Sequence, residues 1–257
     1  MVRTLEYPKT DKNKVQRYNA RAAYDLETIH STIQTSIVLN VAFAPSPDNP
    51  FPIILPMVGA MGSFAHPSAS LSEPLDCYVH GYVTNRMARL ARDSPQGLPV
   101  CVSATKVHGL VLSLTPYSHD VNYKSAVLMG YASIVEDQAE KLWAMELITD
   151  KVCRDRWAET RVPPKSAEMS STGILRIRVE GGSGKVRNGV AHDEREDEED
   201  EALRGRVWTG VVPVMEVYGE PVADEGNKVA NVPEYLSRYV SRKTEEAETG
   251  AKEAMKE

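Results

Sequence analysis

Residues 108–135 constrain the fold of this chain more than any other stretch. They read as two β-strands, HGLVLSLT and SAVLMGYASIV, joined by a polar loop that ends at residues 122–125. The segment just before them, PVCVSATKV, alternates between apolar and polar residues, as a half-buried strand does. The βαβ alternation that a parallel sheet requires is absent from this region. Consecutive strands with short connections therefore favour an antiparallel sheet.

The remainder of the chain repeats this pattern. About six or seven strands are expected in total, and few helices separate them. FPIILPMVGAM is flanked by prolines and predicts an edge strand or an irregular strand, ILRIRVEG alternates as a strand, and SGKVRNG predicts a turn. We therefore expect a mainly β protein, an antiparallel barrel with α-helices packed outside it.

Two helices have clear start signals. One begins after Asp25, a good N-cap, and continues with apolar residues at helical spacing. A second begins after Asp137, where Asp137 and Glu140 form a start that resembles a capping box. Its predicted apolar stripe consists of Leu142, Met145, Ile148 and Val152.

The net charge of −6 is a local property of the sequence. Residues 193–201 contain eight acids and one arginine, so they supply −7 and leave the rest of the chain at +1. We expect this acidic run to be a solvated loop. A clustered basic face, which nucleic-acid binding needs, is not evident, so no nucleic-acid partner is expected.

Cysteine content and hydropathy indicate a cytoplasmic protein. The three cysteines form no C-x-x-C pair, which argues against a disulfide framework. No apolar signal segment and no membrane-spanning run is visible, so no membrane association is expected. We expect an N-terminal arm at 1–23, one domain at 24–240 that ends in a short helix, and a charged, disordered tail at 241–257.

The first candidate site is HGYVTNR, residues 80–86. A strand delivers His80 and Gly81, and a helix is expected to begin near Thr84. Free backbone N–H groups, the Thr84 hydroxyl and Arg86 could bind a phosphate, and a glycine would let it approach the backbone. The segment could equally be an ordinary helix N-cap with a surface arginine, which is the commoner arrangement.

Two strand segments offer further polar groups. Ser103 and Thr105 share one strand face, and they are either solvent-exposed or directed toward a ligand in a barrel mouth. Tyr123, Lys124 and Ser125 could flank a planar ring and bind its polar edge. Alternatively, Tyr123 is a half-buried packing residue in a polar loop.

Lys185 and Arg187 lie in SGKVR, which is not a Walker A loop. Val179 stands where that motif has its first glycine, and Val186 stands where it has Ser or Thr. The two cations are either solvated in a hairpin turn or reach an anionic ligand. The six histidines lack metal-binding spacing, so no metal site is expected, although His119 could be an exposed loop residue, a proton donor or a haem ligand.

In their order and spacing, these segments resemble the FMN-binding split-barrel family related to pyridoxamine 5′-phosphate oxidase, in its flavin-nucleotide-binding, nitroimidazole-resistance-like branch. The segments that carry the resemblance are CYVHGYVTNRMARL, PVCVSATKVHGLVLSLTPYSHDVNYKSAVLMG, DRWAETR, SGKVRNG and WTGVVPV. The resemblance implies a six-stranded antiparallel split β-barrel of Greek-key type, a homodimer, and one FMN at each of two equivalent sites between the subunits.

The resemblance also implies which residues bind the cofactor. They are His80, Gly81, Thr84, Asn85, Arg86, Ser103, Thr105, Tyr123, Lys124, Ser125, Lys185, Arg187 and Trp208. Three features depart from the family pattern. Lys124 replaces an arginine, which removes a bidentate fork; SGK replaces Ser-Ala-Lys; and residues 62–74 are an insertion that could cover the substrate pocket.

Several functions follow from this resemblance, and no catalytic side chain can be assigned. The first is an FMN-dependent oxidoreductase acting on a small organic substrate. The second is a non-catalytic flavin-binding protein. The third is a haem-binding split barrel that uses His80, His108 or His119, and the fourth is an interaction module built on the same scaffold.

Overall fold

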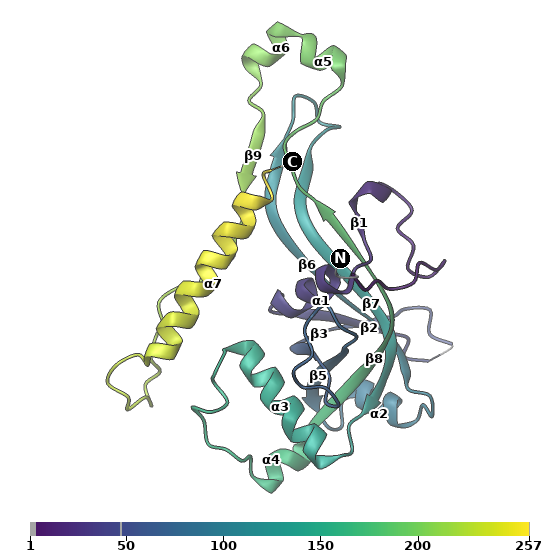
Figure 1. Ribbon diagram of the computed structural model, residues 1–257, viewed down its shortest axis with the longest axis vertical. Coiled ribbons are helices and arrows are strands. Elements are labelled where there is room, and N and C mark those ends of the chain that lie inside the picture. The colour runs from purple at the N-terminus through teal and green to yellow at the C-terminus, as the bar shows by residue number, and fades with distance from the viewer. Residues whose placement is uncertain (1–3, 47, 257) are drawn as a thin grey trace. The chain divides into compact units, whose positions relative to one another are not determined.

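The computed structural model describes residues 4–46 and 48–256, and its central element is a nine-stranded sheet (Figure 1). This confirms the predicted mainly β, antiparallel class. The strands are β1 (Ala22–Ala23), β2 (Leu39–Phe43), β3 (Ile53–Met57), β4 (Gly59–Gly62), β5 (Asp76–Tyr82), β6 (Leu98–Leu112), β7 (Asp120–Ile134), β8 (Thr172–Arg187) and β9 (Gly210–Pro213). The hydrogen-bonded order is β3-β2-β6-β7-β8-β5-β4, with β1 on β8 and β9 on β6.

Helices flank the sheet. They are η1 (Asn19–Arg21), α1 (Leu26–Thr35), α2 (Arg86–Arg92), α3 (Gln138–Val152), α4 (Ser166–Ser171), α5 (Arg195–Glu199), α6 (Glu201–Arg206) and α7 (Glu234–Glu253). The caps of α1 and α3 are as predicted: Asp25 accepts a bond from the Thr28 N–H at 2.8 Å, and Asp137 accepts one from the Glu140 N–H at 2.7 Å.

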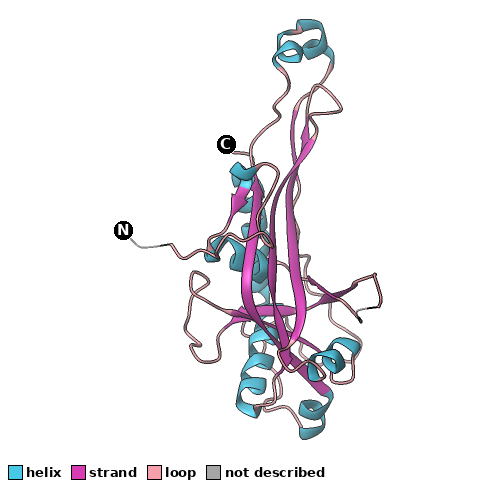
Figure 2. Cartoon of the chain, turned by 90° about the vertical axis from the view of Figure 1, so that its right-hand side faces the viewer, coloured by secondary structure: helices cyan, strands magenta, loops and turns pink. Residues whose placement is uncertain are grey.

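The chain forms two compact units, whose boundary falls within the three longest strands. The first unit comprises Met1–Thr105 and Ser125–Lys185, and the second comprises Lys106–Lys124 and Val186–Glu257. The three long strands, β6, β7 and β8, are the longest of the magenta arrows in Figure 2.

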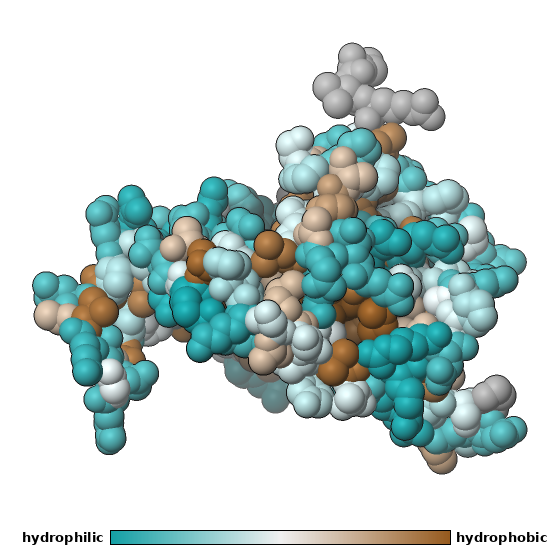
Figure 3. All heavy atoms as spheres, turned by 90° about the horizontal axis from the view of Figure 1, so that it is seen from below, coloured by the Kyte–Doolittle hydropathy of each residue, from teal (hydrophilic) through white to brown (hydrophobic). Residues whose placement is uncertain are grey.

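The apolar core of the first unit lies between α1 and the sheet. Ile29 and Ile33 of α1, Val41 of β2, and Leu175 and Ile177 of β8 are fully buried there. On the face drawn in Figure 3, apolar side chains reach the surface in small patches separated by polar ones. The buried polar residues of the second unit include Asn122 and Arg187.

Strand lengths differ from the sequence prediction. PVCVSATKV and HGLVLSLT form one fifteen-residue strand, β6, and residues 122–125 lie inside β7, so they are not a loop. SGKVR continues β8 and is not a turn, because Gly184 and Lys185 pair with Ala23 and Ala22 of β1. FPIILPMVGAM forms two strands, and the first of them, β3, is the predicted edge strand.

The helix predictions need three corrections. The apolar stripe of α3 is only partly as predicted: Ile148 is buried and Met145 packs against the same core cluster, but Val152 is 57% exposed and Glu140 and Lys141 are buried. The acidic run is not a loop but forms α5 and the start of α6. The predicted disordered tail continues α7 as far as Glu253, because the small side chains of Ala251 and Ala254 are buried.

Candidate functional site

The segment from His80 to Arg86 connects β5 to α2 in the first unit. His80 is exposed near the end of β5, and Arg86 is the first residue of α2. The helix begins two residues after the expected start near Thr84, and its N-cap is Asn85, whose Oδ1 accepts the Ala88 N–H at 2.7 Å. Thr84 is exposed just before the cap. The structure thus brings the predicted phosphate-binding residues together in one turn.

The side chain of Asn85 requires a glycine at position 81. A Cβ at this position would collide with Nδ2 of Asn85 and would lie 3.7 Å from the methyl carbon of Met57. The capping side chain therefore occupies the space that a larger residue would need. Close approach of a phosphate to Gly81, as predicted from the sequence, stays a prediction.

Three arginines make this segment strongly cationic. Arg86 and Arg89 are exposed, and the Arg92 guanidinium donates to the Val83 carbonyl at 2.7 Å. No carboxylate occurs between Cys77 and Arg92. Sequence reasoning identified Arg86 alone, although the three-residue spacing in RMARLAR already placed all three on adjacent turns of one helix.

Ser103 and Thr105 lie on the face of β6 that points away from the core. Ser103 is half-buried and faces Asn40 of β2 in the strand register, and Thr105 is exposed. Their strand neighbours Val102 and Ala104 are buried. The predicted alternation is confirmed, and both hydroxyls are open to a ligand on this face.

Ser125 and Lys185 meet where β7 and β8 lie side by side. The Ser125 hydroxyl donates to the Lys185 carbonyl at 3.4 Å, which is a long, weak bond. The Lys185 ammonium lies 5.5 Å from the centre of the Tyr18 ring. This corner of the first unit therefore combines a cation, an aromatic ring and a hydroxyl.

Tyr123, Lys124, Arg187 and Trp208 belong to the second unit. Tyr123 and Lys124 are half-buried residues of β7. Trp208 is 65% exposed, and its ring lies against Gly210, whose φ of 153° would strain any larger residue.

Arg187 is 4% exposed and bonds to the protein itself. Its Nε donates to Asp120 at 3.0 Å, and its terminal nitrogens donate to the side-chain oxygen of Asn122 and to the carbonyls of Gly189, at 3.2 Å, and Val190, at 3.0 Å. The sequence prediction of a solvated or ligand-facing cation did not foresee this burial. A direct contact between Arg187 and a cofactor stays a prediction.

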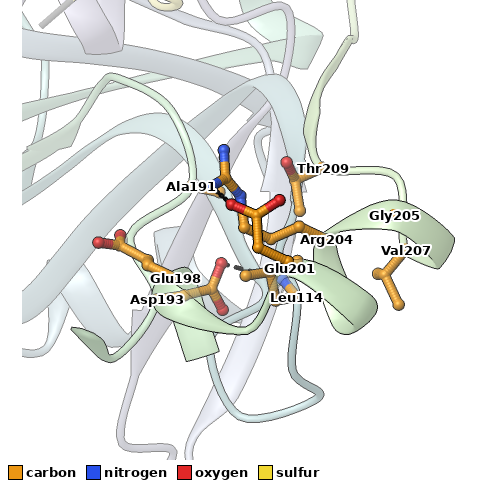
Figure 4. A pocket seen from close by; sticks show the side chains of 9 residues that line it. All are labelled: Leu114, Ala191, Asp193, Glu198, Glu201, Arg204, Gly205, Val207 and Thr209. Carbon is orange, nitrogen blue, oxygen red and sulfur yellow. Dashed lines mark hydrogen bonds and ion pairs between the residues drawn. The ribbon is translucent and has the colours of Figure 1, made fainter. Parts of the chain in front are cut away.

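A hollow of about 720 Å³ in the second unit is lined by carboxylates (Figure 4). Asp193 accepts the Leu114 N–H at 2.9 Å, and Glu201 lies 3.7 Å from Arg204. Glu198 adds a further negative charge. Such a lining repels a phosphate, so this hollow does not suit a nucleotide's anionic end.

The predicted residues form separate groups within one chain. Among residues 4–46 and 48–256, no hydrogen bond or ion pair connects the His80–Arg86 segment with Ser103, Thr105, Ser125 or Lys185. The described residues also contain no group of three or more His, Cys, Asp or Glu side chains that could hold a metal ion. None of the helices in the described ranges has the length and apolar character to cross a membrane.

The antiparallel sheet with its flanking helices is consistent with a split β-barrel, although the sheet is not closed. The sequence model of the pyridoxamine 5′-phosphate oxidase family matches residues 25–186, more than half of the chain. The chain belongs to this family, which confirms the predicted resemblance. Of the candidate residues, only Arg187 and Trp208 lie outside the matched range.

Two solved structures share the fold over most of their length. The flavocytochrome Anf3 from Azotobacter vinelandii is 24% identical, with a TM-score of 0.72 over 90% of this chain and 97% of its own. A FAD and haem binding protein from Mycobacterium smegmatis is 22% identical, with a TM-score of 0.70 over 86% of this chain and 97% of its own. The search of curated proteins found no significant match.

Proposed function

We propose that this protein binds a flavin nucleotide and uses it to oxidise or reduce a small organic molecule. The observation that carries the proposal is the exposed pair Arg86 and Arg89, beside the Thr84 hydroxyl, within the range that matches the family. A flavin phosphate needs cationic and hydroxyl donors, and these side chains supply both. The flavin, when bound, supplies the redox chemistry, and the chain positions it and tunes its electronics.

The ring would lie on the outer face of β6, where Ser103 and Thr105 present hydroxyl groups. Lys185 is the candidate cation for the polar edge of the ring, because its ammonium lies beside the Tyr18 ring and its backbone carbonyl accepts a weak bond from the Ser125 hydroxyl. The proposal names FMN, since the Arg86 segment offers a single phosphate site. One of the two solved structures is a FAD and haem binding protein, and the other is a flavocytochrome. The identity of the cofactor is therefore the first property to measure.

A homodimer is part of this proposal. The His80–Arg86 segment and the Ser125–Lys185 corner are not connected by any polar contact among the described residues of one chain. A second copy would supply the missing half of each site. Sedimentation of the purified protein should give the mass of two chains, and a monomer that binds flavin would contradict this part of the proposal.

The test of flavin binding is an absorption spectrum of the purified protein, followed by mass analysis of the molecule released on denaturation. Replacing both Arg86 and Arg89 by Gln should weaken flavin binding tenfold or more, roughly 1.4 kcal/mol or above. Arg154→Gln, which changes an exposed arginine elsewhere in the first unit, is the matched control. Colourless protein that does not bind added FMN or FAD would contradict the proposal.

Haem binding in addition to flavin is the second candidate. The observation that favours it is the orientation of His119, whose Nδ1 lies 2.7 Å from the Thr115 carbonyl while Nε2 takes no part in that bond. Ligand histidines commonly use one ring nitrogen in this way and coordinate through the other. A Soret band that disappears in His119→Ala, with flavin retained, would support this candidate. Protein without a Soret band after growth with added haem would contradict it.

A further inference from the structure

The first unit contains a groove of about 380 Å³, and its lining includes none of the residues proposed to bind the flavin. It lies where the end of β2, the start of β6 and the last part of β7 come together. Its lining is largely apolar and includes Ala42, Cys101, Met129 and Tyr131. This volume falls at the small end of the range for ligand sites, about 300–1,000 Å³.

One wall carries an accessible thiol. Cys101 is exposed, whereas the other two cysteines, Cys77 and Cys153, are buried. In the register of β2 and β6, the residue opposite Cys101 is Ala42, whose small side chain leaves the sulfur open to the groove. Met129 supplies a second sulfur atom. Polarizable sulfur atoms contact aromatic rings favourably.

The aromatic wall is held in place on two sides. The Arg178 guanidinium lies 5.7 Å from the centre of the Tyr131 ring, and Arg178 forms an ion pair with Glu180 at 3.0 Å. Gly97, with a φ of 90°, brings the backbone so close to Tyr131 that a Cβ there would lie 2.9 Å from the tyrosine Cβ. The Tyr131 ring is therefore held in a fixed position, and an aromatic ligand could stack against it.

The groove is continuous with the face that carries Ser103. Cys101 and Ser103 are two residues apart on the same face of β6, a separation of roughly 7 Å along a strand. A molecule in the groove would thus lie beside the surface on which the flavin ring is proposed, without using the arginine segment.

From these observations we infer that the groove is a binding site for a small, flat, apolar molecule with one or two aromatic rings. The apolar walls exclude a strongly charged ligand, because a buried charge without a partner is costly. The two charged lining residues, Lys12 and Glu180, are exposed and can contact polar substituents at the mouth. The inference concerns binding alone and is independent of the flavin.

The Cys101 thiol provides the readout. In the native chain, a chromogenic disulfide reagent should react quickly with one thiol, since Cys77 is buried and burial raises its pKa to about 12. Saturating indole should slow this reaction at least fivefold, whereas glucose should not. The uncharged naphthalene dye Prodan should fluoresce with the protein, and indole should displace it.

Two variants connect these signals to the groove. Ala44→Trp places a large ring at an exposed position in the lining, so it should abolish both the dye signal and the protection by indole. Cys101→Ser should lose the fast thiol reaction and keep dye binding.

Two further variants are controls. Ile37→Trp changes an exposed residue outside the lining and should behave as wild type. The double change of Arg86 and Arg89 to Gln should leave all these signals intact, which separates this inference from the flavin proposal.

Three outcomes would overturn the inference. One is a Cys101 reaction rate that indole does not change. Another is a dye that still fluoresces with Ala44→Trp and that indole does not displace from Cys101→Ser. The third is a thiol that reacts only after dilution dissociates a dimer, which would show that a second copy of the chain covers the groove.

Discussion

The Tyr7 hydroxyl lies 2.6 Å from Nε2 of His30, and the other ring nitrogen of His30, Nδ1, lies 2.8 Å from the Leu71 carbonyl. A carbonyl oxygen only accepts hydrogen bonds, so Nδ1 carries the proton and Nε2 accepts the tyrosine hydroxyl. These two bonds connect the N-terminal arm to α1, and α1 to the loop that contains Leu71. His30 itself is fully buried.

Tyr7→Phe should lower the free energy of unfolding by about 1–2 kcal/mol, because it leaves a buried acceptor without its donor. Urea denaturation followed by circular dichroism measures the change. Tyr117→Phe is the control, since Tyr117 is 85% exposed and should change stability by less than about 0.5 kcal/mol. Equal stability of both variants would show that the Tyr7–His30 bond is not formed in solution.

His30 should also make the protein sensitive to mild acid. Burial lowers the pKa of His30, and the bond to the Leu71 carbonyl only partly opposes this effect. The unfolded chain therefore takes up a proton below about pH 6.5 that the folded chain resists, so stability is complete above this pH and falls below it. Urea midpoints at pH 8, 6.5 and 5 should show the decrease, and His30→Gln should flatten it. An unchanged slope in His30→Gln would contradict the assignment.

The sequence predicted the fold where local signals and tertiary packing agree. Asp25 and Asp137 cap their helices as expected, and the alternation around Val102 identified a true strand. It failed at SGKVRNG, residues 183–189, which suggested a turn. Gly184 continues β8 and pairs with Ala23 of β1, and a Cβ on Gly184 would lie 3.3 Å from the Ala23 Cβ. No local pattern reports a partner about 160 residues away in the sequence.

The candidate site was predicted unevenly for a similar reason. Arg86 could be found because a strand end followed by a cap is a local pattern. The burial of Arg187 could not, since its partners Asp120 and Asn122 come from a different strand. The groove beside Cys101 was also missed, because it forms only when β2, β6 and β7 lie together.

Lys151→Met should destabilise the first unit by about 1.5–3 kcal/mol, the range for hydrogen bonds to a charged group. The Lys151 ammonium donates to the Ser36 carbonyl at 2.8 Å, just after α1, and to the Gly59 carbonyl at 3.1 Å. Removing the charge leaves both carbonyls without this donor. Lys228→Met, at an exposed position, is the control for the loss of one positive charge. Thermal unfolding of the two variants under identical conditions provides the comparison, and indistinguishable midpoints would contradict the role of Lys151.

Arg187→Met should cost about 1.5–3 kcal/mol, because it removes the buried guanidinium that donates to Asp120, to Asn122 and to the carbonyls of Gly189 and Val190. Arg187→Lys should restore little, since one ammonium cannot reproduce the planar set of donors. Lys185→Met, two residues earlier in β8, should instead weaken flavin binding with a small effect on stability. Urea unfolding and flavin titration of all three variants distinguish the stabilising role of Arg187 from the flavin-binding role of Lys185. An Arg187→Met protein with wild-type stability and lost flavin binding would show that Arg187 contacts the cofactor.

His108→Phe should leave the stability at pH 7.5 unchanged or raise it by up to about 1 kcal/mol. Nε2 of His108 is buried without a hydrogen-bond partner among the described residues, and a Cβ on Gly250 of α7 would lie 3.3 Å from the imidazole ring. A phenyl ring of similar shape removes the unsatisfied nitrogen and keeps the packing. Burial, Lys124 and Lys106 lower the pKa of His108, against a smaller opposing effect of Glu216, so the variant should also lose less stability than wild type between pH 7.5 and 5.5. Urea denaturation at both pH values tests this, with His119→Phe as the exposed control. A loss of 2 kcal/mol or more at pH 7.5 would contradict the prediction, because it would show that Nε2 has a partner in solution.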